Sequence, residues 1–144
     1  MNITVRVTQS MGHRLEHHAG LCYNLHGHNY VFEVTLAGNP DPMSGMVRDF
    51  SDVKRMLKEF LDPFDHAMIL SSTDPARLVI PSDMRLVLLS VSPTAENFAS
   101  LVYNRLVDLG FSPVQVLVRE TESGWAIADK VDRTVRVMGR TVPV

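Results

Sequence analysis

Residues 26–37 read HGHNYVFEVTLA, and this stretch decides the fold. From residue 29 onward, apolar side chains recur at every second position, which is typical of a strand with one buried face, and we predict this strand over 29–37. His26 and His28 share the parity of the apolar set. Because side chains two positions apart in a strand point to the same side, both imidazoles lie on the buried face if no bulge intervenes.

Two histidines on one side of a strand suggest a metal site. Imidazole nitrogen is a preferred ligand of zinc, and three protein ligands with one open position is the catalytic arrangement. Gly27 leaves room between them for a close approach to the backbone. His13 lies upstream as a third candidate ligand. The alternative is that the pair binds no metal, as we expect for His17 and His18, which fall in a polar loop and are solvated.

Cys22 is the only cysteine of the chain and lies four positions before His26. Two roles are open for it. It could be a fourth zinc ligand in a closed Cys-His₃ structural site. Otherwise its thiolate, favoured by a nearby metal or by His66, is a base or a nucleophile.

Asp65 directly precedes His66. The functional hypothesis for this pair is an imidazole that a carboxylate holds in place, so that it accepts or relays a proton near neutral pH. The alternative is a solvated loop in which the two residues are neighbours by chance.

Glu120 shares the parity of Val116 and Val118, so it points toward the apolar side of its strand. A carboxylate there is costly unless it is paired or hydrogen-bonded, and no arginine or lysine on that strand has the same parity. A ligand with two adjacent N–H groups would satisfy it. The alternative is a glutamate at the strand end that reaches solvent.

Other segments carry helix and strand signals. Alternation predicts further strands at residues 3–8, 113–120 and about 125–137. Apolar spacing predicts a helix that Ser51 or Asp52 can cap and that ends at Pro63. It predicts a second helix with Thr94 as N-cap, which Gly110 terminates.

The predicted order is strand, strand, helix, helix, strand, strand (ββααββ), with a segment at about 71–92 that predicts a short helix near 74–78 and an extra strand at 84–90. A four-stranded antiparallel sheet with two helices on one face satisfies the amphipathic patterns, so the predicted fold class is α+β. Its other face and its edges need cover, and we therefore expect assembly into a closed oligomer.

Composition narrows the function classes. The 144 residues, 45% of them hydrophobic, suffice for one core and predict one domain over 1–144. A net charge of −2 without a basic run argues against a nucleic-acid partner. No apolar stretch approaches a membrane span, and the N-terminus lacks a signal-peptide pattern. A single cysteine fits a reducing compartment, so we expect a cytoplasmic protein.

Six blocks of the sequence resemble, in order, the motifs of the 6-pyruvoyl-tetrahydropterin synthase superfamily. The most specific is CYNLHGHNY at residues 22–30, which is similar to the family's CxxLHGHxY motif. The other blocks are His13-Arg14-Leu15, GMVRDF at 45–50, Asp65-His66, PTAEN at 93–97 and Glu120-Thr121. The spacing from Cys22 to the first histidine of the HGH motif resembles the bacterial 6-carboxy-tetrahydropterin synthases of the 7-deazaguanine (queuosine) pathway.

The resemblance implies a fold and an assembly. Members of the superfamily have a tunnelling fold, in which a four-stranded antiparallel sheet with two helices assembles into barrels with sites at subunit interfaces. We therefore expect a homo-oligomer, such as a hexamer or a related barrel.

The resemblance also implies a lyase reaction and a role for each candidate residue. His13, His26 and His28 would hold Zn²⁺, which leaves a position for the vicinal hydroxyls of a 7,8-dihydroneopterin triphosphate substrate. Cys22 would be the base, with His66 and Asp65 as a proton relay. In addition, Glu120 would anchor the pterin. Thr94 and Glu96 would also contact the substrate.

Three departures from the family pattern occur, at residues 9–12, after His66, and in the 71–92 insertion, which is longer than in compact members. Three other functions stay open. They are formation of the 6-pyruvoyl product, retro-aldol cleavage of dihydroneopterin, which some relatives perform, and a non-catalytic binding protein with structural zinc. By charge alone, the candidates for the triphosphate site are Arg14, Lys130 and Arg133.

Overall fold

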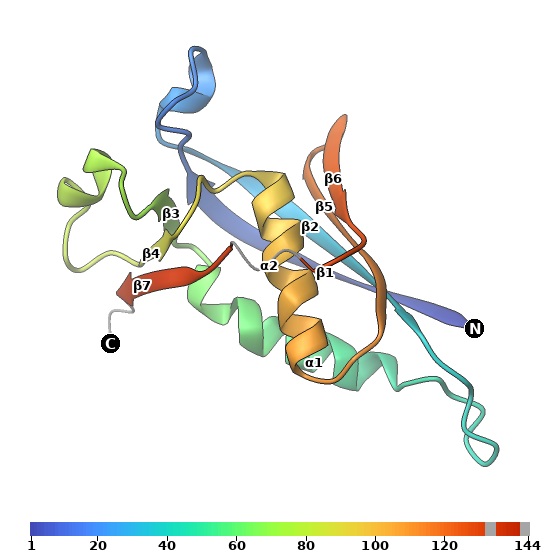
Figure 1. The fold of residues 1–144 in the computed structure, drawn as a ribbon. Coiled ribbons are helices and arrows are strands. Elements are labelled where there is room, and N and C mark those ends of the chain that lie inside the picture. Colours follow the sequence, from blue (N-terminus) through green and yellow to red (C-terminus); the bar gives the residue numbers. More distant parts are fainter. Residues whose placement is uncertain (132–134, 142–144) are drawn as a thin grey trace.

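The stretch HGHNYVFEVTLA forms strand β2 (His26–Ala37), and β1 (Asn2–His13) pairs with it (Figure 1). The antiparallel register runs without a shift over all 12 residues of β1. Because no bulge intervenes, one face of the ladder is turned to the core along its length, and the two half-buried histidines of β2 share that face, as predicted.

The computed structural model describes residues 1–131 and 135–141. Besides β1 and β2, this part of the chain forms α1 (Phe50–Leu61), β3 (Met68–Ser71), β4 (Leu86–Leu89), α2 (Ala95–Asp108), β5 (Pro113–Thr121), β6 (Gly124–Ala128) and β7 (Val137–Thr141). Short 3-10 turns lie at η1 (Leu21–Tyr23), η2 (Asp62–Phe64) and η3 (Pro75–Leu78). The strands form one sheet in the order β6-β5-β2-β1-β3-β4-β7.

The fold class is α+β, but the prediction of a four-stranded antiparallel sheet is wrong, because the sheet has seven strands and is mixed. The half formed by β6, β5, β2 and β1 is antiparallel throughout. β3 then joins β1 in parallel, at Gly12 and His13 alone, and β4 runs parallel to β3. β3 escaped prediction because an apolar run of this length does not distinguish a strand from other buried segments by its periodicity.

The strand predicted at about 125–137 is shorter than expected, and a second strand begins only where it was expected to end. β6 ends at Ala128, ahead of Asp129 and Lys130, which belong to residue types depleted in strands. β7 begins at Val137 and pairs antiparallel with β4 instead of continuing beside β5. Residues 132–134 of the predicted strand lie outside the described part of the chain.

The 71–92 segment holds the two elements predicted for it. The short helix near 74–78 is η3, and the extra strand at 84–90 is β4. The unexpected feature is where β4 lies, since it links β3 to β7 and so carries the sheet beyond β1.

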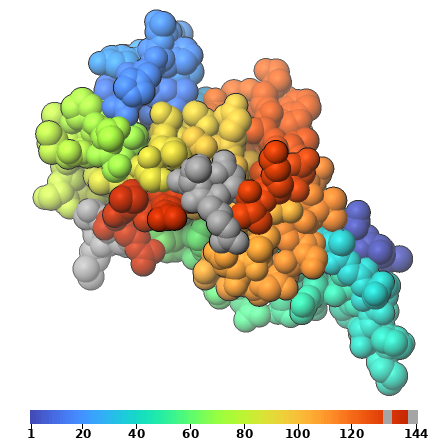
Figure 2. All heavy atoms as spheres, in the orientation of Figure 1, coloured from blue at the N-terminus to red at the C-terminus, as the bar shows by residue number. Residues whose placement is uncertain are grey.

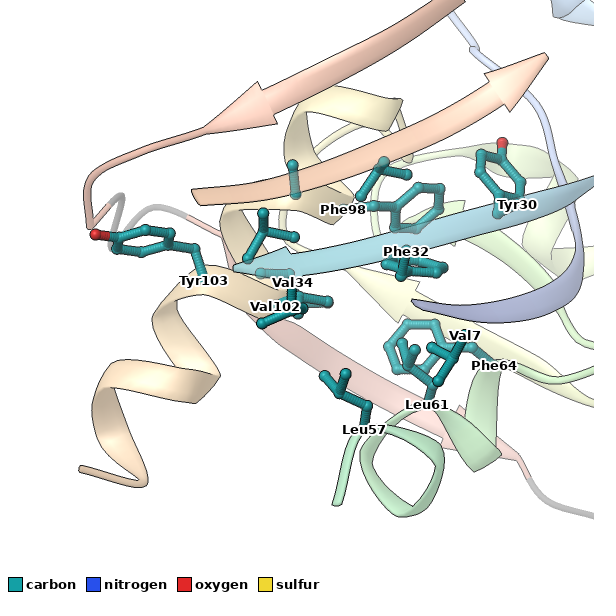
Figure 3. Packing of buried hydrophobic residues seen from close by; sticks show 14 of the residues in the cluster. Val7, Tyr30, Phe32, Val34, Leu57, Leu61, Phe64, Phe98, Val102 and Tyr103 are labelled. Atoms are coloured by element: carbon teal, nitrogen blue, oxygen red, sulfur yellow. The ribbon is translucent and has the colours of Figure 1, made fainter. Parts of the chain in front are cut away.

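Both helices contribute to one apolar cluster with the buried face of β1 and β2 (Figure 3). Leu57 and Leu61 come from α1, whereas Phe98 and Val102 come from α2, and each is about 1% exposed. The Phe98 ring meets the Tyr30 ring edge-on, with centroids 5.3 Å apart. This packing fixes Tyr30 directly beneath the histidine end of the ladder.

The two helix N-termini differ in how well the sequence predicts them. Thr94 caps α2 as expected, because its hydroxyl accepts the Asn97 N–H at 3.2 Å. For α1 the predicted caps are wrong, because Asp49 accepts the Ser51 N–H at 2.7 Å and the helix begins at Phe50. All three residues are of types that cap helices, so composition alone does not choose among them.

Within residues 1–131 and 135–141, neither helix combines the length and the apolar character needed to cross a bilayer.

The Asp49 cap leads to a stability prediction. We expect Asp49→Ala to lower the free energy of unfolding by about 1 kcal/mol, because one N–H of the first turn loses its acceptor. Asp49→Asn keeps an acceptor and should stay close to the parent. Urea unfolding followed by circular dichroism measures the difference, and Ser51→Ala is the control. A larger loss in the control than in Asp49→Ala would show that the cap is misassigned.

Candidate metal centre and active site

Three imidazoles meet at the end of the β1–β2 ladder. His13 is the last residue of β1, and His26, the first residue of β2, lies opposite it. His28 follows one pleat later on the same face. Among the described residues these three form a group that could hold a metal ion, with one ligand atom from each and all ligand atoms within 4.8 Å of one another. The structure therefore brings together the three metal ligands that the sequence predicts.

Two backbone carbonyls fix the orientation of two of the rings. His13 Nδ1 lies 2.7 Å from the carbonyl oxygen of Pro93, and His26 Nδ1 lies 2.7 Å from that of Asn24. A carbonyl oxygen only accepts, so each Nδ1 carries the proton and donates it. In the neutral rings, each Nε2 is then left with a lone pair, which is the form that binds a metal.

The Nε2 atoms are placed as metal ligands would be. Those of His13 and His26 lie 3.1 Å apart. Two lone pairs facing each other repel, whereas two zinc ligands at about 2.0–2.1 Å from a tetrahedral ion are separated by only slightly more than this distance. His28 Nε2 is buried without a hydrogen-bond partner among the described residues. The three donors thus fit a divalent ion that prefers imidazole nitrogen.

Burial favours the neutral state of His13. His13 is 1% exposed, and this burial lowers its pKa below the ordinary value for histidine, although the hydrogen bond to Pro93 opposes the shift. Burial also raises the pKa of the Tyr30 hydroxyl far above its usual range, and the nearby Glu120 charge adds to the effect. Tyr30 therefore stays protonated as a donor.

Glu120 faces the histidines from β5. Its Oε1 lies 3.7 Å from His28 Nε2, and its Oε2 lies 4.0 Å from His13 Nε2. The Tyr30 hydroxyl donates to Oε2 at 3.3 Å. The side chain is 26% exposed, so the carboxylate is partly buried and keeps lone pairs free for a further donor.

Glu120 also lines a cavity of about 410 Å³. The wall of this cavity includes Cys22, Thr94 and Glu96, so the structure gathers four of the candidate residues around one space. Trp125 lines it as well, although no motif or periodicity had singled out this residue. Cys22 is half-buried in η1 and does not belong to the three-residue metal group found in the described part of the chain.

Asp65 and His66 lie elsewhere. Their side chains meet, with Asp65 Oδ2 2.9 Å from His66 Nδ1. His66 lines a different cavity of about 470 Å³, which includes His26 and His28 but not Cys22. The structure thus forms the predicted carboxylate–imidazole pair and places its imidazole at a different cavity from the thiol.

His66 has an unusual backbone. Its φ is +54°, in the left-handed region that residues with a Cβ avoid, and no other non-glycine residue of the described part has a positive φ. The His66 N–H donates to the Ser10 carbonyl at 2.7 Å, which ties this conformation to β1. Strain of this kind is held where the surroundings require it, often at functional sites.

The charged candidates for a triphosphate site differ in availability. Arg14 is 13% exposed and its Nε donates to Asp74 at 2.8 Å, so this guanidinium is already engaged. Lys130 is exposed. Arg133 lies outside the described residues.

Known proteins resemble this chain over most of its length. The family profile described as 6-pyruvoyl tetrahydropterin synthase matches residues 2–130. The 6-carboxy-5,6,7,8-tetrahydropterin synthase of Rickettsia typhi is 33% identical over 129 residues, which cover 83% of this chain and 94% of that protein. A putative 6-pyruvoyl tetrahydrobiopterin synthase of Caenorhabditis elegans is 34% identical over 107 residues, which cover 71% and 68%.

The fold has solved counterparts as well. The structure of Caenorhabditis elegans 6-pyruvoyl tetrahydropterin synthase superimposes with a TM-score of 0.69 at 25% identity, over 90% of this chain and 95% of that one. An uncharacterised protein of Wolinella succinogenes superimposes with a TM-score of 0.73 at 22% identity, over 90% and 97%.

The imidazole cluster predicts metal binding. Metal-free protein should take up about one zinc ion per chain, and His28→Ala should weaken zinc binding by at least about 100-fold, because one of three ligands is lost. Competition with a chromogenic chelator measures the affinity. His17→Ala is the matched control, since this side chain is 85% exposed and lies outside the cluster. Equal affinities in the two variants would contradict the assignment.

The backbone of His66 predicts a difference between two variants. Both His66→Gly and His66→Ala delete the imidazole, but only glycine adopts a positive φ without strain. We expect the glycine variant to exceed the alanine variant in free energy of unfolding by about 1 kcal/mol. Urea titration of the two proteins side by side tests this, and an alanine variant as stable as the glycine variant would rule out strain at this position.

Proposed function

The chain belongs to the 6-pyruvoyl tetrahydropterin synthase family, and we propose that it converts 7,8-dihydroneopterin triphosphate and water into 6-carboxy-5,6,7,8-tetrahydropterin, acetaldehyde and triphosphate. The observation that carries the proposal is a cavity of about 410 Å³ that both Cys22 and Glu120 line, with Glu120 also facing three converging imidazoles. The name of the Rickettsia typhi relative supports the carboxy-forming outcome.

In this proposal, His13, His26 and His28 hold Zn²⁺. A zinc ion with an open position acidifies a bound substrate hydroxyl and polarises a developing carbonyl. The carbonyl contacts of His13 and His26 keep both Nε2 atoms available for this role.

Glu120 anchors the pterin. Its carboxylate accepts the 2-amino and N3–H groups of the ring as a bidentate pair, which is the recognition its partly buried position favours. The Tyr30 hydroxyl holds Oε2 and so sets the orientation of the carboxylate. Thr94 and Glu96, at the start of α2, supply further polar contacts from the cavity wall.

Cys22 is the base that removes a proton from the substrate side chain, and His66 with Asp65 relays protons. Within one chain Cys22 and His66 line different cavities. We therefore propose a homo-oligomer, a hexamer or a related barrel, in which sites at subunit interfaces bring the thiol of one copy to the imidazole of another.

The sheet edges support this assembly. Among the described residues, the outer edge of β1 pairs with β3 only at Gly12 and His13, and β6 is the last strand on its side. Edges with unpaired backbone groups are ready to pair with another copy.

The remaining parts of the proposal concern context. We propose that residues 1–144 form one domain, that the protein acts in the cytoplasm without a nucleic-acid or membrane partner, and that its product enters 7-deazaguanine (queuosine-type) biosynthesis. The second candidate function is formation of 6-pyruvoyl-tetrahydropterin, which the name of the Caenorhabditis elegans relative favours.

The decisive experiment combines product analysis with a cysteine variant. Incubated with 7,8-dihydroneopterin triphosphate, the parent protein should release acetaldehyde and form the 6-carboxy product, both detected by mass spectrometry. A 6-pyruvoyl product without acetaldehyde would instead establish the second function.

The cysteine variant separates a catalytic role from a structural one. Cys22→Ala should lower kcat at least about 100-fold, because the proton acceptor is lost, while zinc content stays near that of the parent. Loss of zinc together with the fold would establish the alternative of a purely structural zinc site with Cys22 as a ligand.

A further inference from the structure

The insertion at 71–92 lies against the loop that carries Cys22. Figure 2 shows the segments near residues 14–25 and 74–85 in contact at one end of the molecule. Arg14 and Asp74 join them, with Arg14 Nε 2.8 Å from Asp74 Oδ2. Neither residue has a role in the proposed reaction, so the contact between them needs another explanation.

Asp74 makes two contacts, one within the insertion and one with Arg14. Its carboxylate is fully buried, with 0% of the side chain exposed. Oδ1 accepts the Ala76 N–H at 2.8 Å and so caps η3, while Oδ2 accepts from Arg14. A buried carboxylate with both oxygens engaged fixes its partner more firmly than a solvated one would.

Arg14 passes this constraint to the cysteine loop. Its guanidinium carbon lies 4.4 Å from the centre of the Tyr23 ring, and Tyr23 is the residue after Cys22. The Leu15 N–H donates to the Cys22 carbonyl at 2.8 Å, which joins the two ends of the loop. The loop is therefore held by the backbone of Leu15, the residue after Arg14, as well as by the Arg14 side chain.

A second contact connects the same two segments. The Thr73 hydroxyl donates to Glu16 Oε1 at 2.7 Å. Two adjacent residues of the insertion thus bind two residues of the loop, Arg14 and Glu16. Because the two segments are attached at two points, they can neither separate nor rotate freely relative to each other.

We propose that Asp74 is a positioning residue that acts through Arg14, so that the 71–92 insertion sets the place of the Cys22 thiol in the cavity. The importance of this placement for turnover rests on the proposed function. The placement itself concerns only the folded protein, and it is testable without any substrate.

The experiment measures how fast iodoacetamide alkylates Cys22, which is the only cysteine in the chain. At one fixed pH and equal zinc content, Asp74→Asn should raise the rate at least about threefold, because the loop opens more often. Under turnover conditions it should lower kcat about 10-fold with KM within about twofold of the parent, because a displaced base slows chemistry more than binding.

The matched control breaks a different ion pair, which lies within the β1–β2 ladder and outside the loop. Arg6 Nε donates to Glu33 at 2.9 Å across the exposed face of β1 and β2. Arg6→Gln should leave both alkylation and kcat at parent values. An alkylation rate in Asp74→Asn within about twofold of the parent would overturn the proposal.

Circular dichroism shows whether Asp74→Asn folds, since it leaves the Arg14 charge buried without its partner. If it does not fold, the double variant Arg14→Gln/Asp74→Asn decides, because it removes both charges of the pair together and leaves neither one unpaired. Faster alkylation in this double variant supports the proposal, and a rate within about twofold of the parent overturns it. Should the protein not act on the pterin triphosphate at all, the alkylation rates still decide the placement, so the two failures are distinguishable.

Discussion

The unbroken register between β1 and β2 puts His13 opposite His26, and the geometry of the candidate site depends on this pairing. Since side chains alternate, a slip by one residue would turn the histidines of one strand to the opposite face. The length of the ladder stabilises this register. The alternation that turns the imidazoles to one face also buries the apolar side chains of Val5, Val7, Phe32 and Val34, which a slip would expose. Folding the core and assembling the metal ligands are therefore one event.

A polar cluster is thus built directly on an apolar core. Tyr30 lies at the boundary, with its ring against Phe98 and its hydroxyl among His13 and Glu120. Each nitrogen of His13 has a polar neighbour, and Pro93, whose carbonyl accepts the hydrogen bond from Nδ1–H, immediately precedes the cap of α2. The start of that helix consequently serves the site in two ways, by orienting a ligand and by lining the adjacent cavity.

Local signals predicted much of this arrangement. The parity of residues 26–37 placed two imidazoles on the buried face, and Thr94 and Gly110 marked the ends of α2, because each of these features depends on near neighbours in the chain. The parity of Glu120 likewise pointed to the side on which it meets Tyr30.

Contacts between residues far apart in the chain could not be predicted from the sequence. β3 and β7 form only because segments far apart in the chain supply their partners. The pairing of Arg14 with Asp74 joins residues 60 positions apart, and that of His13 with the Pro93 carbonyl joins residues 80 apart. A backbone oxygen carries no sequence signature, and an arginine next to a motif histidine looks like a phosphate ligand until its carboxylate is located.

The pairing of β4 with β7 sets the order in which the sheet can be completed during synthesis. The antiparallel half uses residues up to Ala128, whereas β4 waits for β7 (Val137–Thr141), which follows later in the chain. Until β7 has emerged from the ribosome, the outer edge of β4 is open, a short distance in sequence from Asp74, the partner of Arg14. The nascent chain therefore has the strands of its histidine ladder before β7 emerges, and β4 gains its second neighbour only afterwards.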